Sequence, residues 1–294
     1  MSLKPALDAI GSAIDTRFDR LLAVPDDARA PLYEAMRHAV MGGGKRMRPL
    51  LVVAACELSN VDRERALRVA LAIEAVHVYS LVHDDLPCMD DDDLRRGKPT
   101  VHKAFDEATA VLCGDALNAL AFELLADEAT HEDPFVRSEL VLELARASGP
   151  AGMAGGQAMD LAAEEATFDL ATTTRLQQLK TGALIAFCLE AGAIMGKVSP
   201  GVRLKLRGYA RDLGLAFQIA DDLLDVEGDP DRAGKALRKD GERGKSTFVS
   251  LLGAARARAQ AEMLIDQAIH HLQGFGPEAD TLRAVARFAI ERDH

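Results

Sequence analysis

The stretch Ala66–Leu86 reads ALRVALAIEAVHVYSLVHDDL, in which apolar side chains recur at helical spacing up to two adjacent aspartates, Asp84 and Asp85. A second aspartate cluster, Asp221–Asp225, closes another apolar segment, Val202–Leu224. Carboxylates in such apolar surroundings are costly to bury without a compensating charge. A polycation between the two clusters would supply that charge. We expect Mg²⁺, which binds a few carboxylates together with waters and phosphate oxygens.

The rest of the chain repeats this helical pattern with little strand-like alternation. The further segments with apolar residues at helical spacing are Leu50–Leu58, Ala108–Leu125, Phe135–Ala147, Leu170–Met195 and Leu251–Leu272. Glycine and proline separate them by mostly short loops, which favours antiparallel helices in a bundle. No Ser-, Gly- or Pro-rich linker divides the chain and no repeat of fixed period is present. We therefore predict an all-α protein with a single domain over residues 1–294.

The composition fits a soluble enzyme rather than a nucleic-acid binder. Hydrophobic residues make up 48% of the chain and aromatic residues only 4%, as in helices rich in alanine and leucine. The formal net charge of -11 would repel a phosphate backbone, so nucleic acid is not expected as a partner. A small diphosphate needs only a local basic patch and a metal ion, and remains compatible with this charge.

The cysteines and the N-terminus indicate a cytoplasmic protein. The four cysteines, Cys56, Cys88, Cys113 and Cys188, are irregularly spaced, so we expect reduced thiols rather than disulfides or a zinc site. The N-terminus has no basic segment followed by an apolar run, and no stretch is expected to approach a membrane span.

The first aspartate cluster contains a proline that matters for its geometry. Asp84 and Asp90 are six residues apart, a spacing that a regular helix would splay. Pro87 lies between them and prevents a regular helix, so we expect Asp90 to fold back toward Asp84. For the following residues, Asp91–Asp93, a solvated loop is as good an interpretation as a functional one.

The second cluster has the spacing of one helix face. Asp221 and Asp225 are four residues apart, which places both carboxylates on the same side of a helix. Gln218 lies one turn earlier on the same stripe.

Basic residues occur where a diphosphate would need them. The segment Gly42–Pro49 joins a glycine loop to a helix start at Pro49 and combines backbone N–H groups with lysine and arginine charges. It lacks the Walker spacing and a preceding strand, so by itself it is a weak signal. His77 shares a helix face with Asp84, although a satisfied core histidine is the simpler interpretation. The remaining candidates are Arg95, Arg96, Lys180, Thr181, Lys235 and Lys245.

Taken in order, these motifs resemble those of the trans-isoprenyl diphosphate synthases. The segments that carry the resemblance are Gly43–Pro49, Glu74–His77, Ser80–Asp90, Asp93–Thr100, Lys180–Gly182 and Phe217–Asp225. The resemblance runs in order from about Lys45 to Thr247, most of the chain. The resemblance implies an isoprenoid synthase helical bundle around a deep central cavity, usually in a homodimer.

The resemblance also assigns roles to the matching residues. It implies three Mg²⁺ ions per active site, held by Asp84, Asp90 and Asp221, with Asp85, Asp222 and Asp225 as outer or water-mediated ligands. The allylic diphosphate would contact Arg95, Lys180, Thr181, Gln218 and Lys235. Isopentenyl diphosphate would contact Lys45, Arg48, His77 and Arg96, and Lys245 is a further substrate-binding candidate. The expected catalytic residues are Asp84, Asp85, Asp90, Arg95, Lys180, Asp221 and Lys235.

The implied reaction joins isopentenyl diphosphate to dimethylallyl and then geranyl diphosphate, giving farnesyl diphosphate. Metal ions with lysine and arginine would stabilise the leaving diphosphate, and the apolar helix faces would exclude water from the allylic cation. The departing diphosphate is the expected base, so no protein residue is nominated for that role.

Product length would depend on the residues just before the first cluster. Tyr79, five residues before Asp84 and beside Ser80, lies more than one turn below the metal site and would form a floor. With the insertion Pro87-Cys88, this resembles bacterial farnesyl diphosphate synthases. Tyr79 as a plain core residue stays open, as does geranylgeranyl or geranyl diphosphate as the main product.

Two residues depart from the family pattern, and further functions stay open. Arg238 stands where a glycine is usual, and Val249 where a proline commonly follows Thr247-Phe248. The pair His83-Asp84 also allows a metal phosphohydrolase. A terpene cyclase would have no need for the second diphosphate site, and a non-catalytic partner subunit would be expected to lose one of the two aspartate clusters.

Overall fold

The computed structural model describes residues 3–227 and 245–291, and the prediction of an all-α protein is confirmed. The first helices are α1 (Lys4–Leu21), α2 (Ala30–Val40), α3 (Met47–Leu58), α4 (Arg63–Asp84), α5 (Val101–Ala104), α6 (Glu107–Ala126) and α7 (Pro134–Ser148). The later helices are α8 (Met153–Ala162), α9 (Leu170–Gln177), α10 (Ala183–Met195), α11 (Pro200–Glu227), α14 (Phe248–Leu252), α15 (Ala254–His271) and α16 (Asp280–Glu291).

The chain forms two compact units. We call Lys4–Val53 with Asp62–Val141 the N-terminal unit, and Met1–Leu3, Ala54–Val61 and Leu142–His294 the C-terminal unit. Helices α3 and α7 contribute residues to both units.

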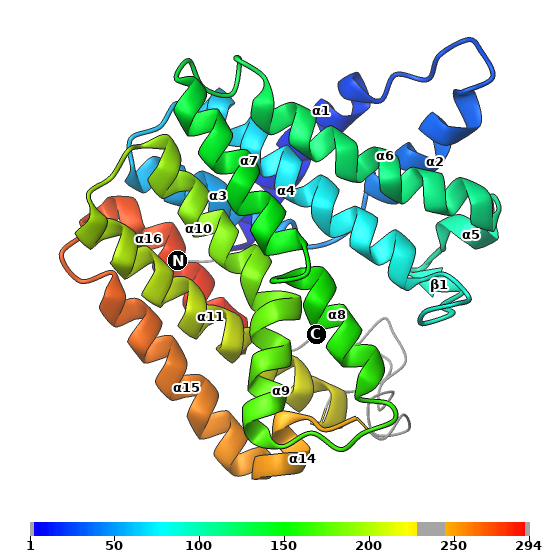
Figure 1. Cartoon of the computed structure of the whole chain (residues 1–294). Coiled ribbons are helices and arrows are strands. Elements are labelled where there is room, and N and C mark those ends of the chain that lie inside the picture. The colour runs from blue at the N-terminus through cyan, green and yellow to red at the C-terminus, as the bar shows by residue number, and fades with distance from the viewer. Residues whose placement is uncertain (1–2, 228–244, 292–294) are drawn as a thin grey trace. The chain divides into compact units, whose positions relative to one another are not determined.

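Helix α4 is the core of the N-terminal unit and lies beside α6 (Figure 1). The side chain of Asp62 caps its start by accepting hydrogen bonds from the backbone N–H groups of Glu64 and Arg65. Most residues from Ala66 to Val82 are buried, which explains why the helix is apolar on more than one face.

Helices α10 and α11 form the centre of the C-terminal unit, and α15 packs along α11 (Figure 1). A Cβ atom at Gly192 of α10 would lie 2.5 Å from the carbonyl carbon of Ala55, so this glycine permits a close helix contact. The hydroxyl of the buried Tyr209 donates a 2.8 Å hydrogen bond to Leu282 O and ties α11 to α16.

The helix boundaries differ from the prediction at three places. Helix α3 begins at Met47 rather than at Pro49. The segment Leu170–Met195 contains a π-helical turn, η1 (Gln178–Gly182), between α9 and α10. The predicted helix Leu251–Leu272 is divided into α14 and α15 at Gly253. The φ of this residue is +80, which a right-handed helix does not allow and which glycine adopts without steric cost. A short 3₁₀ turn, η2 (Pro277–Ala279), precedes α16.

The structure also contains a small antiparallel hairpin that the pattern did not predict. Strand β1 (Leu94–Arg95) pairs with β2 (Lys98–Pro99). Arg96 and Gly97 connect them with φ values of 53 and 76, as a two-residue type I′ turn requires.

The expectation that no stretch approaches a membrane span was wrong by length and composition. Arg63–Asp84, Glu107–Ala126 and Leu170–Met195 are long and apolar enough to cross a membrane by those two criteria. In the folded protein, 67% of the most apolar window of Arg63–Asp84 and 61% of that of Leu170–Met195 are buried. Core packing therefore accounts for the apolar character of these two segments.

The four cysteines are reduced thiols, as expected. Cys56, Cys113 and Cys188 are buried and Cys88 is exposed. Burial raises the pKa of the Cys56 and Cys113 thiols to about 12, so both stay protonated and unreactive at neutral pH.

Candidate active site

The first aspartate cluster forms a compact turn at the end of α4. The helix stops at Asp84, since Pro87 has no N–H to donate to His83 O; Leu86 N donates to that carbonyl instead. Asp90 N donates a 2.8 Å hydrogen bond to Asp84 O. The predicted return of Asp90 toward Asp84 is thus confirmed, and both residues are half-buried.

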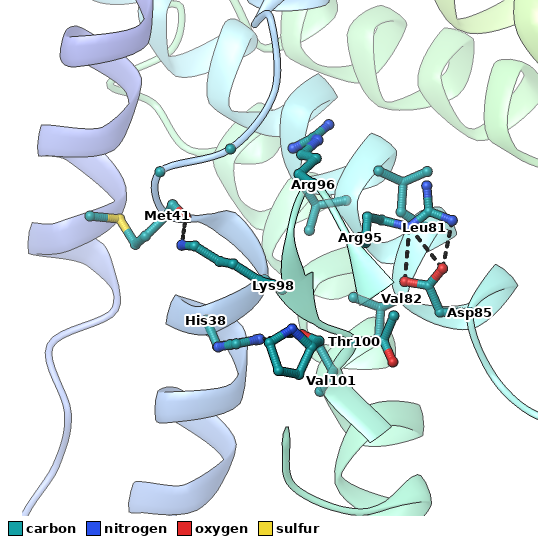
Figure 2. A pocket seen from close by; sticks show the side chains of 15 residues that line it. His38, Met41, Leu81, Val82, Asp85, Arg95, Arg96, Lys98, Thr100 and Val101 are labelled. Atoms are coloured by element: carbon teal, nitrogen blue, oxygen red, sulfur yellow. Dashed lines mark hydrogen bonds and ion pairs between the residues drawn. The ribbon is translucent and has the colours of Figure 1, made fainter. Parts of the chain in front are cut away.

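Asp85 turns toward the hairpin. Its carboxylate is buried and accepts from Arg95 Nε at 2.7 and 2.9 Å, and Arg95 Nη2 lies 2.5 Å from Oδ1 (Figure 2). Burial raises the pKa of Asp85, although the hydrogen bond and charge of Arg95 work against that shift. The pair fixes the guanidinium of Arg95, a predicted substrate-binding residue.

A group of arginines surrounds His77. Burial of the imidazole and the positive charges of four arginines hold the pKa of His77 well below its ordinary value. The arginines are Arg48, Arg96, Arg95 and Arg46. Burial and the neighbouring arginines also lower the pKa of Arg96, although Glu74 acts in the opposite direction. Arg46 and Arg95 are paired with Glu74 and Asp85, and the group as a whole concentrates positive charge near the imidazole, a setting that attracts an anion.

The glycine loop makes room for Arg96. A Cβ atom at Gly44, whose φ is +81, would lie 2.5 Å from the guanidinium carbon of Arg96, and one at Gly43 would lie 3.0 Å from Nη1. The positive φ of Gly44 is the stronger reason for glycine, because the end of the flexible Arg96 side chain could shift. Lys45, directly after the loop, is exposed.

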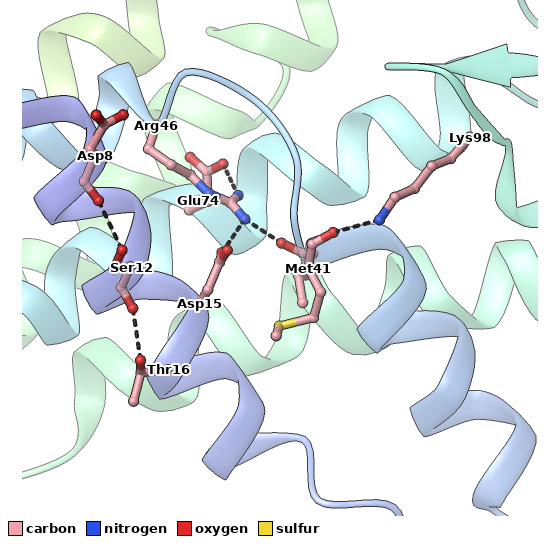
Figure 3. A network of polar contacts seen from close by, with 9 residues as sticks. Asp8, Ser12, Asp15, Thr16, Met41, Arg46, Glu74 and Lys98 are labelled. Atoms are coloured by element: carbon pink, nitrogen blue, oxygen red, sulfur yellow. Dashed lines mark hydrogen bonds and ion pairs between the residues drawn. The ribbon is translucent and has the colours of Figure 1, made fainter. Parts of the chain in front are cut away.

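Arg46 anchors this loop from below (Figure 3). It is buried with φ 50, and its guanidinium contacts Glu74 Oε1 at 2.5 Å, Asp15 Oδ1 at 2.7 Å and Val40 O. Because Arg46 lies between Lys45 and Arg48, its ion pair with α4 fixes the backbone that presents both predicted substrate-binding residues.

A small open pocket lies between α2, α4 and the hairpin (Figure 2). Leu81 and Val82 line its apolar side, while Arg95, Arg96 and Lys98 line its cationic side. Lys98 Nζ donates to Met41 O at 3.1 Å, and His38 Nε2 lies 2.7 Å from Pro99 O. These contacts hold the hairpin, and with it Arg95 and Arg96, against α2.

In the C-terminal unit, one carboxylate holds two of the predicted lysines. Asp160 Oδ2 on α8 accepts from Lys180 Nζ at 3.0 Å and from Lys245 Nζ at 2.8 Å. Burial alone would raise the pKa of Asp160, but the two lysines outweigh it, and the pKa lies below its ordinary value. Sequence reasoning missed Asp160. No pattern in the sequence singled out this residue, because its partners lie far away along the chain.

Gly156 brings α8 against the π-helical turn that carries Lys180 and Thr181. A Cβ atom at Gly156 would lie 2.2 Å from Lys180 N. Such turns are frequent at functional sites, because the wider backbone turns side chains in directions that a regular helix does not allow. Nearby, the buried amide atoms of Gln157 on α8 have no hydrogen-bond partner within the described ranges, an arrangement suited to a polar ligand.

The residues of the second aspartate cluster differ in their contacts. Thr181 Oγ1 donates to Gln218 Oε1 at 3.3 Å, and Gln218 Nε2 donates to Asp222 Oδ1 at 3.0 Å. The other oxygen of the buried Asp222 accepts from Phe248 N at the start of α14, 2.8 Å away. Asp221 and Asp225 are half-buried on one face of α11, as predicted.

Three further predictions concern the loops. Lys235 and Arg238 lie outside the described residues. Val249 is described and buried in α14. The ligand atoms of Asp91, Asp93 and His102 lie within 4.8 Å of one another, and Lys103 Nζ is 2.8 Å from Asp93 Oδ1, so an ion pair already neutralises part of this cluster.

The aspartates suit a divalent cation that prefers oxygen ligands. The backbone hydrogen bond between Asp90 and Asp84 places two half-buried aspartates at one end of α4, and Asp221 and Asp225 lie on one face of α11. Oxygen donors of this kind, with room for waters and phosphate oxygens, match Mg²⁺.

These features define an all-α protein whose clustered cations and carboxylates are suited to binding a small polyanion. The sequence profile of the polyprenyl synthetases matches residues 29–286, and the chain belongs to the polyprenyl synthetase family.

Individual relatives agree with that membership. The chain is 61% identical to an FPP/GFPP synthase from Zymomonas mobilis, whose crystal structure superposes with a TM-score of 0.91 over 98% of both chains. It is 42% identical over 301 residues to the farnesyl diphosphate synthase of Escherichia coli, covering 100% of both proteins. It is 44% identical over 274 residues to geranylgeranyl pyrophosphate synthase 11 of Arabidopsis thaliana, covering 91% of this chain and 76% of that protein.

Proposed function

We propose that this chain condenses isopentenyl diphosphate with dimethylallyl diphosphate and then with geranyl diphosphate, releasing farnesyl diphosphate. The arginine cluster around His77, next to the Asp84–Asp90 turn, is the observation that carries the proposal. The positive charges of these arginines would attract a diphosphate. The full-length match to a farnesyl diphosphate synthase supports the product, and the geranylgeranyl synthase of similar identity keeps the longer product as the alternative.

The roles of the residues follow from family membership and from their contacts. Lys45, Arg48, His77 and Arg96 bind the diphosphate of isopentenyl diphosphate. Arg95, Lys180, Thr181, Gln218, Lys235 and Lys245 bind the allylic diphosphate. The ion pairs of Asp85 with Arg95 and of Asp160 with Lys180 support this assignment, because each fixes a cation that would otherwise lose side-chain entropy on binding.

Asp84, Asp90 and Asp221 would hold Mg²⁺, three ions in each active site, with Asp85 and Asp225 contributing indirectly. Family members generally use this metal. When bound, it supplies positive charge that stabilises the diphosphate as a leaving group. Asp222 accepts hydrogen bonds from Gln218 and Phe248, which supports an indirect role for this residue.

The side chains of the protein then perform three tasks. Arg95 and Lys180 stabilise the negative charge that develops as the allylic C–O bond breaks and its electron pair leaves with the diphosphate. The apolar helix faces keep water from the allylic cation while the double bond of isopentenyl diphosphate adds to it. The cation that results from this C–C bond formation then loses a proton to the departing diphosphate. Tyr79 forms the floor that ends growth at fifteen carbons, with Ser80 beside it.

We further propose that the chain acts as one domain, as a homodimer in the cytoplasm without stable membrane insertion. The family match runs through both compact units, which supports a single domain. Exposed apolar side chains on α6, among them Val111 and Leu112, support an interface with a second copy.

Product analysis tests the proposal. Purified protein is incubated with Mg²⁺, isopentenyl diphosphate and either dimethylallyl or geranyl diphosphate, and the products are sized by mass spectrometry. Farnesyl diphosphate from both starters supports the proposal, and chelation of the metal should abolish it. A twenty-carbon product would keep the reaction class and change the assigned product to geranylgeranyl diphosphate. Release of inorganic phosphate or of a cyclic hydrocarbon, or no reaction at all, contradicts the proposal and favours a phosphohydrolase, a cyclase or a silent subunit respectively.

A further inference from the structure

Tyr79 contacts a second ring one turn later on α4. The ring centroids of Tyr79 and His83 are 5.8 Å apart with an interplanar angle of 72°, an edge-to-face contact. The two residues are four apart and share a helix face, so the position of one ring limits the rotamers open to the other. Tyr79 itself is only half-buried, which means that core packing alone does not immobilise its ring.

His83 is fixed by the neighbouring helix. Its Nε2 lies 3.1 Å from Val111 O on α6, and since a carbonyl only accepts, this nitrogen carries the hydrogen. A Cβ atom at Gly114 would lie 2.0 Å from Nε2 and 2.4 Å from Cδ2 of the same ring. The imidazole therefore occupies the space that the absent side chain of Gly114 leaves on α6.

We propose that His83 and Gly114 determine product length by bracing Tyr79, His83 acting as a positioning residue. The inference rests on the proposed function, in which Tyr79 is the floor. A floor excludes a longer chain only if its ring cannot turn aside when the growing isoprenoid presses on it. The contact to His83, held in turn by Val111 O and by the gap at Gly114, blocks that movement on the α6 side of Tyr79.

We call the contacts of His83 with Tyr79 and with the gap at Gly114 the brace. Two variants disturb it at its two ends. His83→Ala removes the ring that meets Tyr79. Gly114→Ala leaves both rings in the chain but forces the imidazole out of its place, because a methyl group cannot share a space 2.0 Å from Nε2. A shared change in product length from both variants is expected only if the brace acts on Tyr79.

The test compares the ratio of twenty-carbon to fifteen-carbon product in the full-length enzyme and its variants, with the melting temperature of each measured alongside. Tyr79→Ala is the positive control. Gly201→Ala is the matched control, since a Cβ at this helical glycine meets nothing within 4 Å. We expect His83→Ala and Gly114→Ala to raise the ratio by roughly twofold to tenfold, the range that one aromatic contact supports. His83→Phe, which restores a ring, should move the ratio back toward wild type.

The outcomes separate the inference from the proposed function. If Tyr79→Ala lengthens the product while His83→Ala and Gly114→Ala keep the wild-type ratio, the brace is contradicted and the floor stands. Slower turnover at an unchanged ratio also contradicts it, because His83 would then act on the adjacent Asp84. If wild-type protein elongates neither starter, the proposed function itself fails.

Discussion

Asp90 N donates a 2.8 Å hydrogen bond to Asp84 O, so two aspartates six residues apart meet at the end of one helix. The bond closes the turn that Pro87 opens, and it presents both carboxylates in a half-buried setting next to the arginines around His77. Acidic and basic groups are therefore arranged side by side within the N-terminal unit, as binding of a metal-complexed anion requires.

Replacing Asp84 by alanine should lower kcat by about a hundredfold or more, the scale on which one preorganised electrostatic group contributes to catalysis. Steady-state turnover at saturating Mg²⁺ measures the effect. Asp93→Ala is the control, since Asp93 belongs to the same loop but is exposed and paired with Lys103. Near-normal turnover of the Asp84 variant would remove this residue from the metal site.

Arg46→Ala should destabilise the protein by about 3–5 kcal/mol, because it leaves the buried carboxylate of Glu74 without its partner. Urea denaturation followed by circular dichroism measures the free energy of unfolding. The double variant Arg46→Met, Glu74→Leu should recover most of the loss, since apolar residues of similar volume need no compensating charge. If Arg46→Ala is as stable as wild type, the Arg46–Glu74 ion pair does not contribute to stability.

Asp160→Asn should lower kcat/KM for the allylic diphosphate by about tenfold to a hundredfold, the usual effect of losing a residue that orients a ligand-binding group. The reason is that Lys180 and Lys245 lose the carboxylate that holds them. The KM for isopentenyl diphosphate should stay close to its wild-type value. Equal losses for both substrates would indicate general disruption and contradict a role limited to the two lysines.

His77 should titrate well below its ordinary range in the free protein, because burial and the arginine charges lower its pKa. The unfolded chain then binds more protons than the folded one below pH ~6.5, so stability falls as pH decreases from that point at about 1.4 kcal/mol per pH unit until the folded pKa is reached. Diphosphate binding adds negative charge and should raise the pKa of His77.

Nuclear magnetic resonance titration of the ring, with and without inorganic diphosphate, measures both effects. His77→Asn should flatten the pH dependence of stability over that window. A ring that titrates near pH 6.5 without ligand would contradict the lowered pKa.

Local chemistry made the helices and the first aspartate turn predictable. Apolar spacing placed α4, α6, α7 and α11 within a few residues of their observed bounds, because a helix contacting a core must repeat its apolar residues every three to four positions. The return of Asp90 to Asp84 followed from Pro87, whose missing N–H acts on the residues directly before it. The family resemblance could also be found from the sequence, because short motifs of neighbouring residues carry it.

Other features depended on groups far apart in the chain. Strands of two residues have no detectable alternation, so the hairpin that carries Arg95 and Arg96 was missed. The π-helical turn at Lys180 has the same residue pattern as a helix and shows itself only where Gly156 packs against it. Asp160 looked like an ordinary helix residue until Lys180 and Lys245, 20 and 85 positions away, were found on its carboxylate.

The sequence by itself thus determined the all-α architecture, the two aspartate clusters and the class of reaction, since each is written in neighbouring residues. Only the tertiary structure decided which charges support one another: Arg46 with Glu74, Arg95 with Asp85, the lysines with Asp160, and His83 with the gap at Gly114. The physical reason is that ion pairs and close contacts act over a few ångströms in space, and separation along the chain carries no record of them.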